Sequence, residues 1–221
     1  MNNSNRLKLQ AKEIVSKIPN TPNLEIILLC GSVAQGIADE YSDIELKFVW
    51  KNEPSKPERD GILEKLEGEI LFKEYFEDYE WYLTILVEGI KIDISHCTLD
   101  TIHNISDKVF NNLDTSIDLQ AFISSIIDST VLRGDIDELK NKLGIYPEAL
   151  SVKCIEVNLI FESWTLRDVL LKRKDYLTLE SILIQTILQI LRMLFALNKV
   201  YLRSHNFKWL KYQVNHLKLK P

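Results

Sequence analysis

Two acidic residues follow a Gly-Ser pair at a spacing that suits phosphate chemistry. Gly31 and Ser32 come directly after the apolar run Leu24–Cys30, and Asp43 and Glu45 follow a short turn region. Because residues two apart in a strand point to the same side, Asp43 and Glu45 would present two carboxylates on one face. Such a pair draws in a cation, and oxygen ligands suit Mg²⁺ or Mn²⁺. The segment therefore predicts a divalent metal site beside a tight turn.

The Gly31-Ser32 pair suits an approaching phosphate. The missing side chain of Gly31 leaves the backbone accessible, and Ser32 with the following amides can donate hydrogen bonds. The pair alone is equally typical of a strand-to-helix turn that needs a flexible residue. Asp43 and Glu45 alone are equally typical of a solvated strand face. The prediction rests on the combination.

A third acid, Asp93, is expected to complete the metal site. It alternates with Ile92 and Ile94, where an unpaired carboxylate would be costly. If its strand pairs with the one from Asp43 to Trp50, three carboxylates converge, and two metal ions between them would clamp both oxygens of a phosphoryl displacement. The alternative is that Asp93 pairs with a lysine across a hairpin. His96 nearby is more typical of a structural histidine.

Hydrophobic periodicity predicts the elements that position these residues. The first half alternates between helical and strand patterns, and from about residue 98 the helical pattern takes over. Helices are predicted at Leu7–Ile18, Lys56–Leu66, Leu119–Ser129, Ala149–Leu171 and Leu177–Leu202. Strands are predicted at Leu24–Cys30, Asp43–Trp50, Glu69–Phe72, Trp81–Val87 and Ile90–Ser95, the last two joined by a turn at Glu88-Gly89.

These elements predict an α+β protein with two domains. Residues 1–105 would form a mixed sheet flanked by helices, and residues 106–221 a helical bundle. The three cysteines lack metal or disulfide spacing, so they are expected to be reduced core residues.

Charge and hydropathy restrict the partners. A net charge of -5 argues against general binding to a nucleic-acid backbone. The N-terminus lacks the apolar centre of a signal peptide, and polar residues interrupt Ile182–Val200, so no membrane span is expected. The composition therefore favours a cytoplasmic protein with a small-molecule partner.

Gly31-Ser32, Asp43-x-Glu45 and the distant Asp93 together resemble the signature of the DNA polymerase beta nucleotidyltransferase superfamily over roughly the first half of the chain. The resemblance implies that Gly31 and Ser32 hold a nucleoside triphosphate and that Asp43 and Glu45 ligate metal. Asp93 would bind the catalytic metal and help to activate the acceptor hydroxyl. Glu45 stands where the family often has Asp, and its longer side chain still reaches a metal.

The helical second half, with Asn198-Lys199-Val200-Tyr201 and Lys208-Trp209, resembles the bacterial aminoglycoside and lincosamide nucleotidyltransferases. This resemblance implies transfer of a nucleoside monophosphate, by default AMP from ATP, to a hydroxyl of a small molecule such as an antibiotic. Residues 1–105 would then be the catalytic domain, and residues 106–221 the helical domain that binds the acceptor. It also implies a homodimer that pairs through helices. Lys208 would reach the triphosphate as a point charge. Two alternatives remain. One is a protein or RNA acceptor held by the basic tail, residues 199–220, which contains lysine and arginine but no acid. The other is a catalytically inactive nucleotide-binding module.

Overall fold

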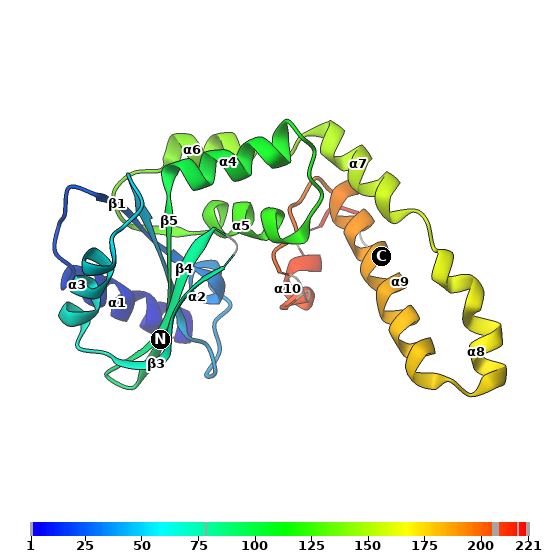
Figure 1. Cartoon of the computed structure of the whole chain (residues 1–221), viewed down its shortest axis with the longest axis horizontal. Coiled ribbons are helices and arrows are strands. Elements are labelled where there is room, and N and C mark those ends of the chain that lie inside the picture. Colours follow the sequence, from blue (N-terminus) through cyan, green and yellow to red (C-terminus); the bar gives the residue numbers. More distant parts are fainter. Residues whose placement is uncertain (1, 78, 205–207, 216, 220–221) are drawn as a thin grey trace. The chain divides into compact units, whose positions relative to one another are not determined.

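The computed structural model describes residues 2–77, 79–204, 208–215 and 217–219 (Figure 1). Its strands are β1 (Leu24–Cys30), β2 (Ile44–Trp50), β3 (Glu69–Glu77), β4 (Glu80–Val87), β5 (Ile90–Thr98) and β6 (Thr130–Arg133). Its helices are α1 (Asn3–Ser16), α2 (Gly31–Gln35), α3 (Lys56–Leu66), α4 (Leu99–Phe110), α5 (Ile117–Ile127), α6 (Asp137–Leu143), α7 (Glu148–Asn158), the 3₁₀ helix η1 (Glu162–Leu166), α8 (Arg167–Arg173), α9 (Tyr176–Leu197) and α10 (Leu210–Asn215).

The chain forms two compact units. The first, here called the sheet unit, contains residues 1–106 and 125–144, and the second, the helical unit, contains residues 107–124 and 145–221. Residues 125–144 thus return to the sheet unit after the predicted boundary near residue 105. They do so because β6 adds a strand beside β1, with Leu28 opposite Val131. The predicted assignment of separate catalytic and acceptor-binding domains stays a prediction.

The sheet unit contains a six-stranded mixed sheet in the order β3-β4-β5-β2-β1-β6. Strands β2 and β5 are parallel, and the other neighbouring pairs are antiparallel. The predicted hairpin is confirmed: β4 and β5 meet at Glu88-Gly89, where Gly89 has a φ of 80°. A mixed sheet flanked by helices, with a helical region after it, is the predicted α+β fold class.

One face of the sheet packs on α1 and α3. Alternate β2 residues, Ile44, Leu46, Phe48 and Trp50, are all buried in this core. The α1 and α3 side chains packed against them include Leu7, Ala11, Ile14, Val15, Ile62 and Leu66. Each fully buried large apolar side chain contributes roughly 1.5–3 kcal/mol, so this face fixes the strand register. Strand geometry then places Asp43, Glu45 and Lys47 on the opposite face.

The helical unit has its own small core. Phe195 at the end of α9 is buried against Leu202 and Leu217. The Ser151 hydroxyl of α7 donates to the carbonyl of Ala196 at 2.7 Å, and the rings of Tyr146 and Tyr201 lie 4.6 Å apart. Tyr201 is buried. These contacts anchor the C-terminal end of α9.

Several predicted elements are wrong in extent: α1 begins and ends earlier than predicted, and β3 and β5 continue beyond Phe72 and Ser95. The helix expected at Ala149–Leu171 is divided, because α7 ends at Asn158, whose side chain donates to the carbonyl of Cys154 at 2.7 Å, before η1 and α8 begin. The helix expected to continue to Leu202 ends at Leu197, where Asn198 donates to the carbonyl of Leu194 and Lys199 adopts a φ of 55°. The helix expected to reach Ser129 ends at Ile127.

Among the described residues, one helix, α9, is long and apolar enough to cross a bilayer by length and composition. A single helix of this kind is weak evidence for a membrane protein, since core helices pass the same criterion. The cytoplasmic location stays a prediction. All three cysteines are buried and none forms a disulfide, as expected for reduced core residues.

Candidate active site

The three predicted acids lie on neighbouring strands. The parallel pairing of β2 and β5 sets Glu45 directly opposite Asp93 and Ile44 opposite Ile92. Asp43 immediately precedes β2, in line with Lys91 of β5. The strand pairing that would bring the three acids together is therefore present, on the sheet face opposite the α1 and α3 core.

Lys91 joins two of the three carboxylates. Its Nζ donates to Oδ2 of Asp43 and to Oδ2 of Asp93, each at 2.7 Å. The other carboxylate oxygen of Asp93 accepts from the Thr84 hydroxyl of β4 at 2.6 Å. Asp93 does pair with a lysine, but that lysine lies on its own strand and not across the hairpin. The ion pair brings Asp43 and Asp93 within reach of one cation.

Electrostatics favour the charged forms of this cluster. Partial burial of Asp43 would raise its pKa, but the hydrogen bond and positive charge of Lys91 outweigh burial and lower it. Burial would likewise lower the pKa of Lys91, but the hydrogen bonds to Asp43 and Asp93 raise it. At neutral pH the site therefore holds an ionised Asp43 and a charged Lys91.

Two constraints require glycine at position 31. It begins α2 directly after β1 and has a φ of 64°, in the left-handed region that favours glycine. A Cβ there would lie 2.1 Å from Oε1 of Glu45, so the Glu45 carboxylate packs directly on the glycine. Ser32 beside it is largely buried, at 8% exposure. The predicted phosphate-binding turn and the acids thus share one location.

The donor set fits a hard divalent cation in part. Within the described residues, no three acidic, histidine or cysteine side chains converge closely enough to hold one metal ion. Two carboxylates, Asp43 and Asp93, nevertheless already share a cation, the Lys91 ammonium. Mg²⁺ is commonly bound through one or two carboxylates plus substrate phosphates. These two side chains, with Glu45 alongside, can therefore hold Mg²⁺ or Mn²⁺ if Lys91 moves aside.

A second ion pair on the same sheet face is closed to solvent. The Lys47 ammonium of β2 donates to Glu80 of β4, and both side chains are almost fully buried. Glu80 also accepts from the Tyr82 hydroxyl at 2.9 Å. Burial would lower the pKa of Lys47, but the Glu80 charge raises it. This pair has no access to a ligand and fixes β2 and β4 across β5.

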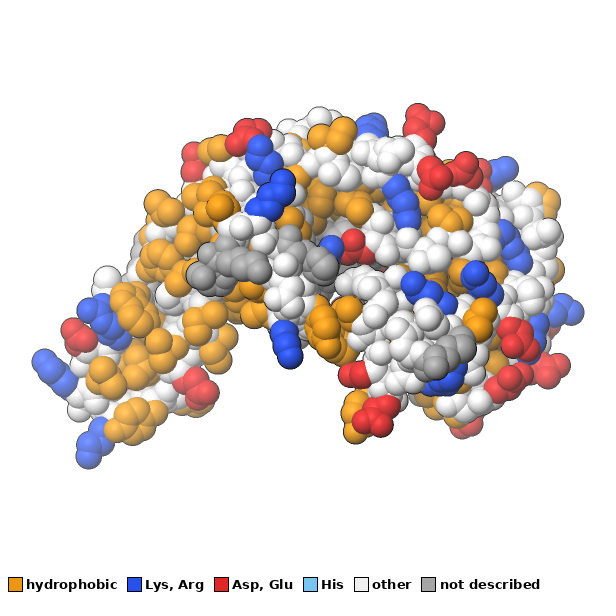
Figure 2. Space-filling view, turned by 180° about the vertical axis from the view of Figure 1, so that it is seen from behind, with side chains coloured by type: hydrophobic (Ala, Val, Ile, Leu, Met, Phe, Trp, Pro, Cys, Tyr) orange, Lys and Arg blue, Asp and Glu red, His pale blue; other side chains and the backbone are white. Residues whose placement is uncertain are grey.

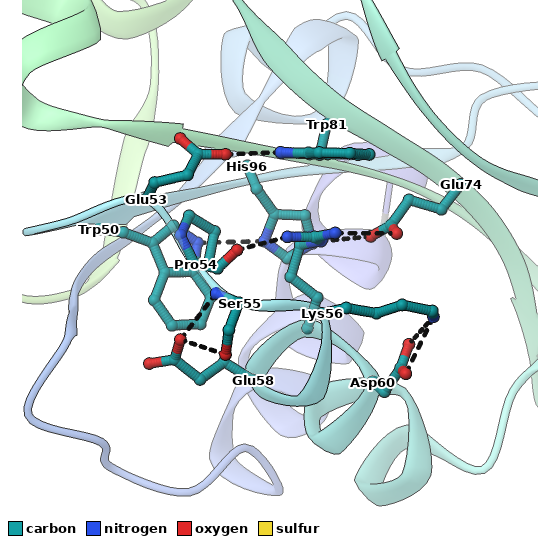
Figure 3. A network of polar contacts seen from close by, with 11 residues as sticks. Trp50, Glu53, Pro54, Ser55, Lys56, Glu58, Asp60, Glu74, Trp81 and His96 are labelled. Atoms are coloured by element: carbon teal, nitrogen blue, oxygen red, sulfur yellow. Dashed lines mark hydrogen bonds and ion pairs between the residues drawn. The ribbon is translucent and has the colours of Figure 1, made fainter.

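The opposite side of the sheet carries a polar network without ligand access. Arg59 of α3 is buried, donates to Glu74 and lies 4.1 Å above the Trp81 ring (Figure 3). Trp50 donates to Nδ1 of His96 at 3.1 Å, and burial lowers the pKa of His96 to about 3. His96 is therefore neutral and structural, and lies on the face away from Asp93.

Sequence reasoning missed four polar residues of this sheet face: Lys91, Thr84, Lys47 and Glu80. The alternation Lys91-Ile92-Asp93 was a usable signal, since it places Lys91 and Asp93 on one face. Thr84 and Glu80 carried no such signal, because their contacts depend on strand pairing.

Lys208 belongs to the helical unit. It is exposed, and its backbone N–H donates to the Ser204 hydroxyl at 2.8 Å. Its contact with a triphosphate stays a prediction.

Comparison with known proteins gives distant structural matches. No protein-family model and no curated protein matches the chain. Among solved structures, the chain is similar to a nucleotidyltransferase-like protein from Exiguobacterium sibiricum 255-15, at 11% identity over 97% of this chain and 67% of that one, with a TM-score of 0.39. It is also similar to Cid1 in complex with ApU, at 14% identity over 56% and 40% with a TM-score of 0.32.

A third match is a cytoplasmic RNA terminal U-transferase, at 19% identity over 54% of this chain and 35% of that one, with a TM-score of 0.28. The chain spans well under half the length of Cid1 and of this transferase. Likenesses of this size add no support for a particular substrate, so function is inferred from the site.

Proposed function

We propose that this protein is a metal-dependent nucleotidyltransferase that moves a nucleoside monophosphate, by default AMP from ATP, onto a hydroxyl of a small molecule. One observation carries the proposal: Asp43 and Asp93 share the Lys91 ammonium on one sheet face, and the Glu45 carboxylate beside them packs against the backbone of Gly31. Phosphoryl chemistry needs carboxylates that hold divalent cations beside a surface that admits a triphosphate.

Each residue has a defined task in this reaction. The acceptor oxygen forms a bond to the α-phosphorus, the bond from that phosphorus to the bridging oxygen breaks, and pyrophosphate leaves. Asp93 accepts the proton of the acceptor hydroxyl. Gly31 and Ser32 would hold the phosphates once the Glu45 carboxylate moves off Gly31. Bound Mg²⁺ or Mn²⁺, held by Asp43 and Asp93 and by Glu45 after this movement, would supply neutralisation of the triphosphate charge.

Lys91 must leave the carboxylates before a metal can take its place. Its side chain is 42% exposed, so it can move into solvent or towards the phosphates. The ammonium then keeps the two aspartates together until the metal and nucleotide arrive. Catalysis would be mainly positioning and charge neutralisation.

The acceptor and the partners belong to the same proposal. The net charge of -5 supports a small acceptor over a nucleic acid. An antibiotic acceptor, a contact of Lys208 with the triphosphate and a cytoplasmic location are implied by the resemblance and the composition. Figure 2 shows many exposed hydrophobic side chains over the helical unit. A homodimer would cover those of α9 such as Leu183, Ile184 and Ile187.

Pyrophosphate release tests the reaction. The four triphosphates are incubated with Mg²⁺ and either a panel of aminoglycosides, lincosamides and other hydroxylated metabolites or RNA oligonucleotides. We expect release with at least one small molecule, and a fall of at least about 10²-fold in Asp93→Asn. Asp60→Asn, in an exposed pair with Lys56, is the matched control and keeps full activity.

Three results would contradict parts of the proposal. Full turnover by Asp93→Asn would remove the assigned role of that carboxylate. Release only with RNA would replace the small-molecule acceptor. Tight nucleotide binding with no release under any condition would indicate the inactive module.

A further inference from the structure

Arg192 lies in an unusual position in the helical unit. It is one of two charged residues, with Glu180, in the largely apolar helix α9. Its side chain is half-buried, and its Nε is buried without a hydrogen-bond partner. Among the described residues it forms no ion pair. Burying part of a guanidinium without an anion costs free energy. Binding of an anionic ligand would offset this cost.

Two hollows of the helical unit meet at Arg192. The first, of about 520 Å³, is lined by Arg192 together with Phe161, Trp164 and Gln185. The second, of about 430 Å³, is lined by Arg192 with Ser116, Asn158 and the acidic Asp118, so an anionic ligand is favoured in the first hollow. The first lies in the range of small-molecule sites, roughly 300–1,000 Å³. Arg192 is thus accessible to a ligand from either hollow.

The larger hollow offers donors and rings beside the guanidinium. Side chains of Ser163 and Gln185 line it and make no hydrogen bond within the described part of the chain, whereas Thr186 and Gln189 are engaged with carbonyls of the same unit. Trp164 and Phe161 add aromatic surface. Among the described residues that line this hollow Arg192 is the charged one, and the Arg167 guanidinium lies 5.3 Å from the centre of the Trp164 ring, so these surroundings favour an anion.

We propose that this hollow binds a small molecule that carries an aromatic ring and an oxyanion, a phosphate or a carboxylate. The guanidinium of Arg192 pairs with the oxyanion, since its planar fork matches both groups in two parallel hydrogen bonds. The ring packs on Trp164, and Ser163 and Gln185 donate to the remaining oxygens. A cation would be repelled, and a neutral ligand would leave the guanidinium unpaired. The inference does not depend on the proposed nucleotidyl transfer.

Titration of the full chain with three probes tests this site. Phenyl phosphate and benzoate carry the two oxyanions, and phenol is the neutral control. Binding is followed by calorimetry and by tryptophan fluorescence. We expect saturable binding of at least one anion, no measurable binding of phenol, and loss of the fluorescence response in Trp164→Phe. Whichever anion binds more tightly identifies the group that the site prefers.

Variants at Arg192 decide between a ligand site and a structural residue. Arg192→Gln should bind the anion about tenfold or more weakly, because a charge-assisted pair is lost. Its melting temperature without ligand should not fall. Arg173→Gln, an equal charge change at the exposed end of α8, should bind as the native protein does. If Arg192→Gln does not fold, Arg192→Lys serves instead, and it should bind several-fold more weakly.

The proposal is overturned if neither anion binds the native chain saturably. Equal binding by the native protein and by the Arg192 variant would overturn it as well.

Discussion

Lys47 and Lys91 lie on neighbouring strands and on the same face of the sheet, yet their surroundings differ. The Lys47 side chain is 6% exposed and its partner Glu80 5%, whereas the Lys91 side chain is 42% exposed. Separating a buried ion pair leaves an unpaired charge in the core, whereas an exposed ammonium can leave its carboxylates and be replaced there by water or another cation. The Lys47–Glu80 pair is therefore a fixed structural contact of the sheet, whereas Lys91 occupies the candidate metal site and can be exchanged for another cation.

Removal of Glu80 should have the largest effect. Glu80→Gln leaves the buried Lys47 ammonium without its counter-ion, which should cost about 3–5 kcal/mol of unfolding free energy. Urea denaturation measures this loss. Glu88→Gln, in the exposed pair with Lys17, is the matched control, and its loss should stay below about 1 kcal/mol. Similar losses in both variants would remove the distinction between fixed and exchangeable pairs.

A substitution at Gly31 tests the candidate metal site, the exchangeable side of this comparison. Gly36→Ala adds only the strain of a positive φ, because nothing lies near its added Cβ, and should cost about 1 kcal/mol. Gly31→Ala has that strain and also meets the Glu45 carboxylate, so it should lose about twice as much or more. Chemical denaturation compares the two variants. Mn²⁺ titration should show weaker binding in Gly31→Ala alone, and unchanged binding there would separate Glu45 from the metal.

His96 tests whether buried groups dominate the pH response. Its pKa falls to about 3 because it is buried, so the folded chain keeps it neutral while the unfolded chain protonates below about 6.5. Its stability contribution is complete above that pH and is lost as the pH falls, by about 2 kcal/mol at pH 5. Unfolding between pH 7 and 5 measures the slope. His96→Asn should reduce it, and His103→Gln, at an exposed position, should keep it.

Lys91 should show the smallest change in stability. Lys91→Met breaks an exposed ion pair and should alter unfolding free energy by less than about 1 kcal/mol. Without the competing ammonium, Asp43 and Asp93 should bind Mn²⁺ several-fold more tightly in the absence of nucleotide. Electron paramagnetic resonance of Mn²⁺ measures this affinity, with Lys17→Met as the control for charge. Weaker Mn²⁺ binding in Lys91→Met would mean that Lys91 organises the metal ligands and does not compete with the metal.

The sequence was most informative where pattern and burial agree. Alternation along Ile44–Trp50 and the turn at Glu88-Gly89 predicted two strands and a hairpin that the structure confirms. Prediction from the sequence failed where pairing between distant segments determines the secondary structure. No element was predicted for the four residues of β6, which form a strand beside β1. The side chain of Asn158 ends α7 within a continuous helical pattern.

For the candidate site, residue types and a period of two were sufficient to select Asp43, Glu45 and Asp93 and to place them on one face. The partners of these acids were decided by tertiary structure. The parallel register of β2 and β5 sets Glu45 opposite Asp93 and brings Asp43 beside the Lys91 ammonium. The antiparallel register of β4 and β5 brings the Thr84 hydroxyl onto Asp93. A local pattern records which side of a strand a residue occupies, whereas its neighbours across the sheet depend on how distant strands pair.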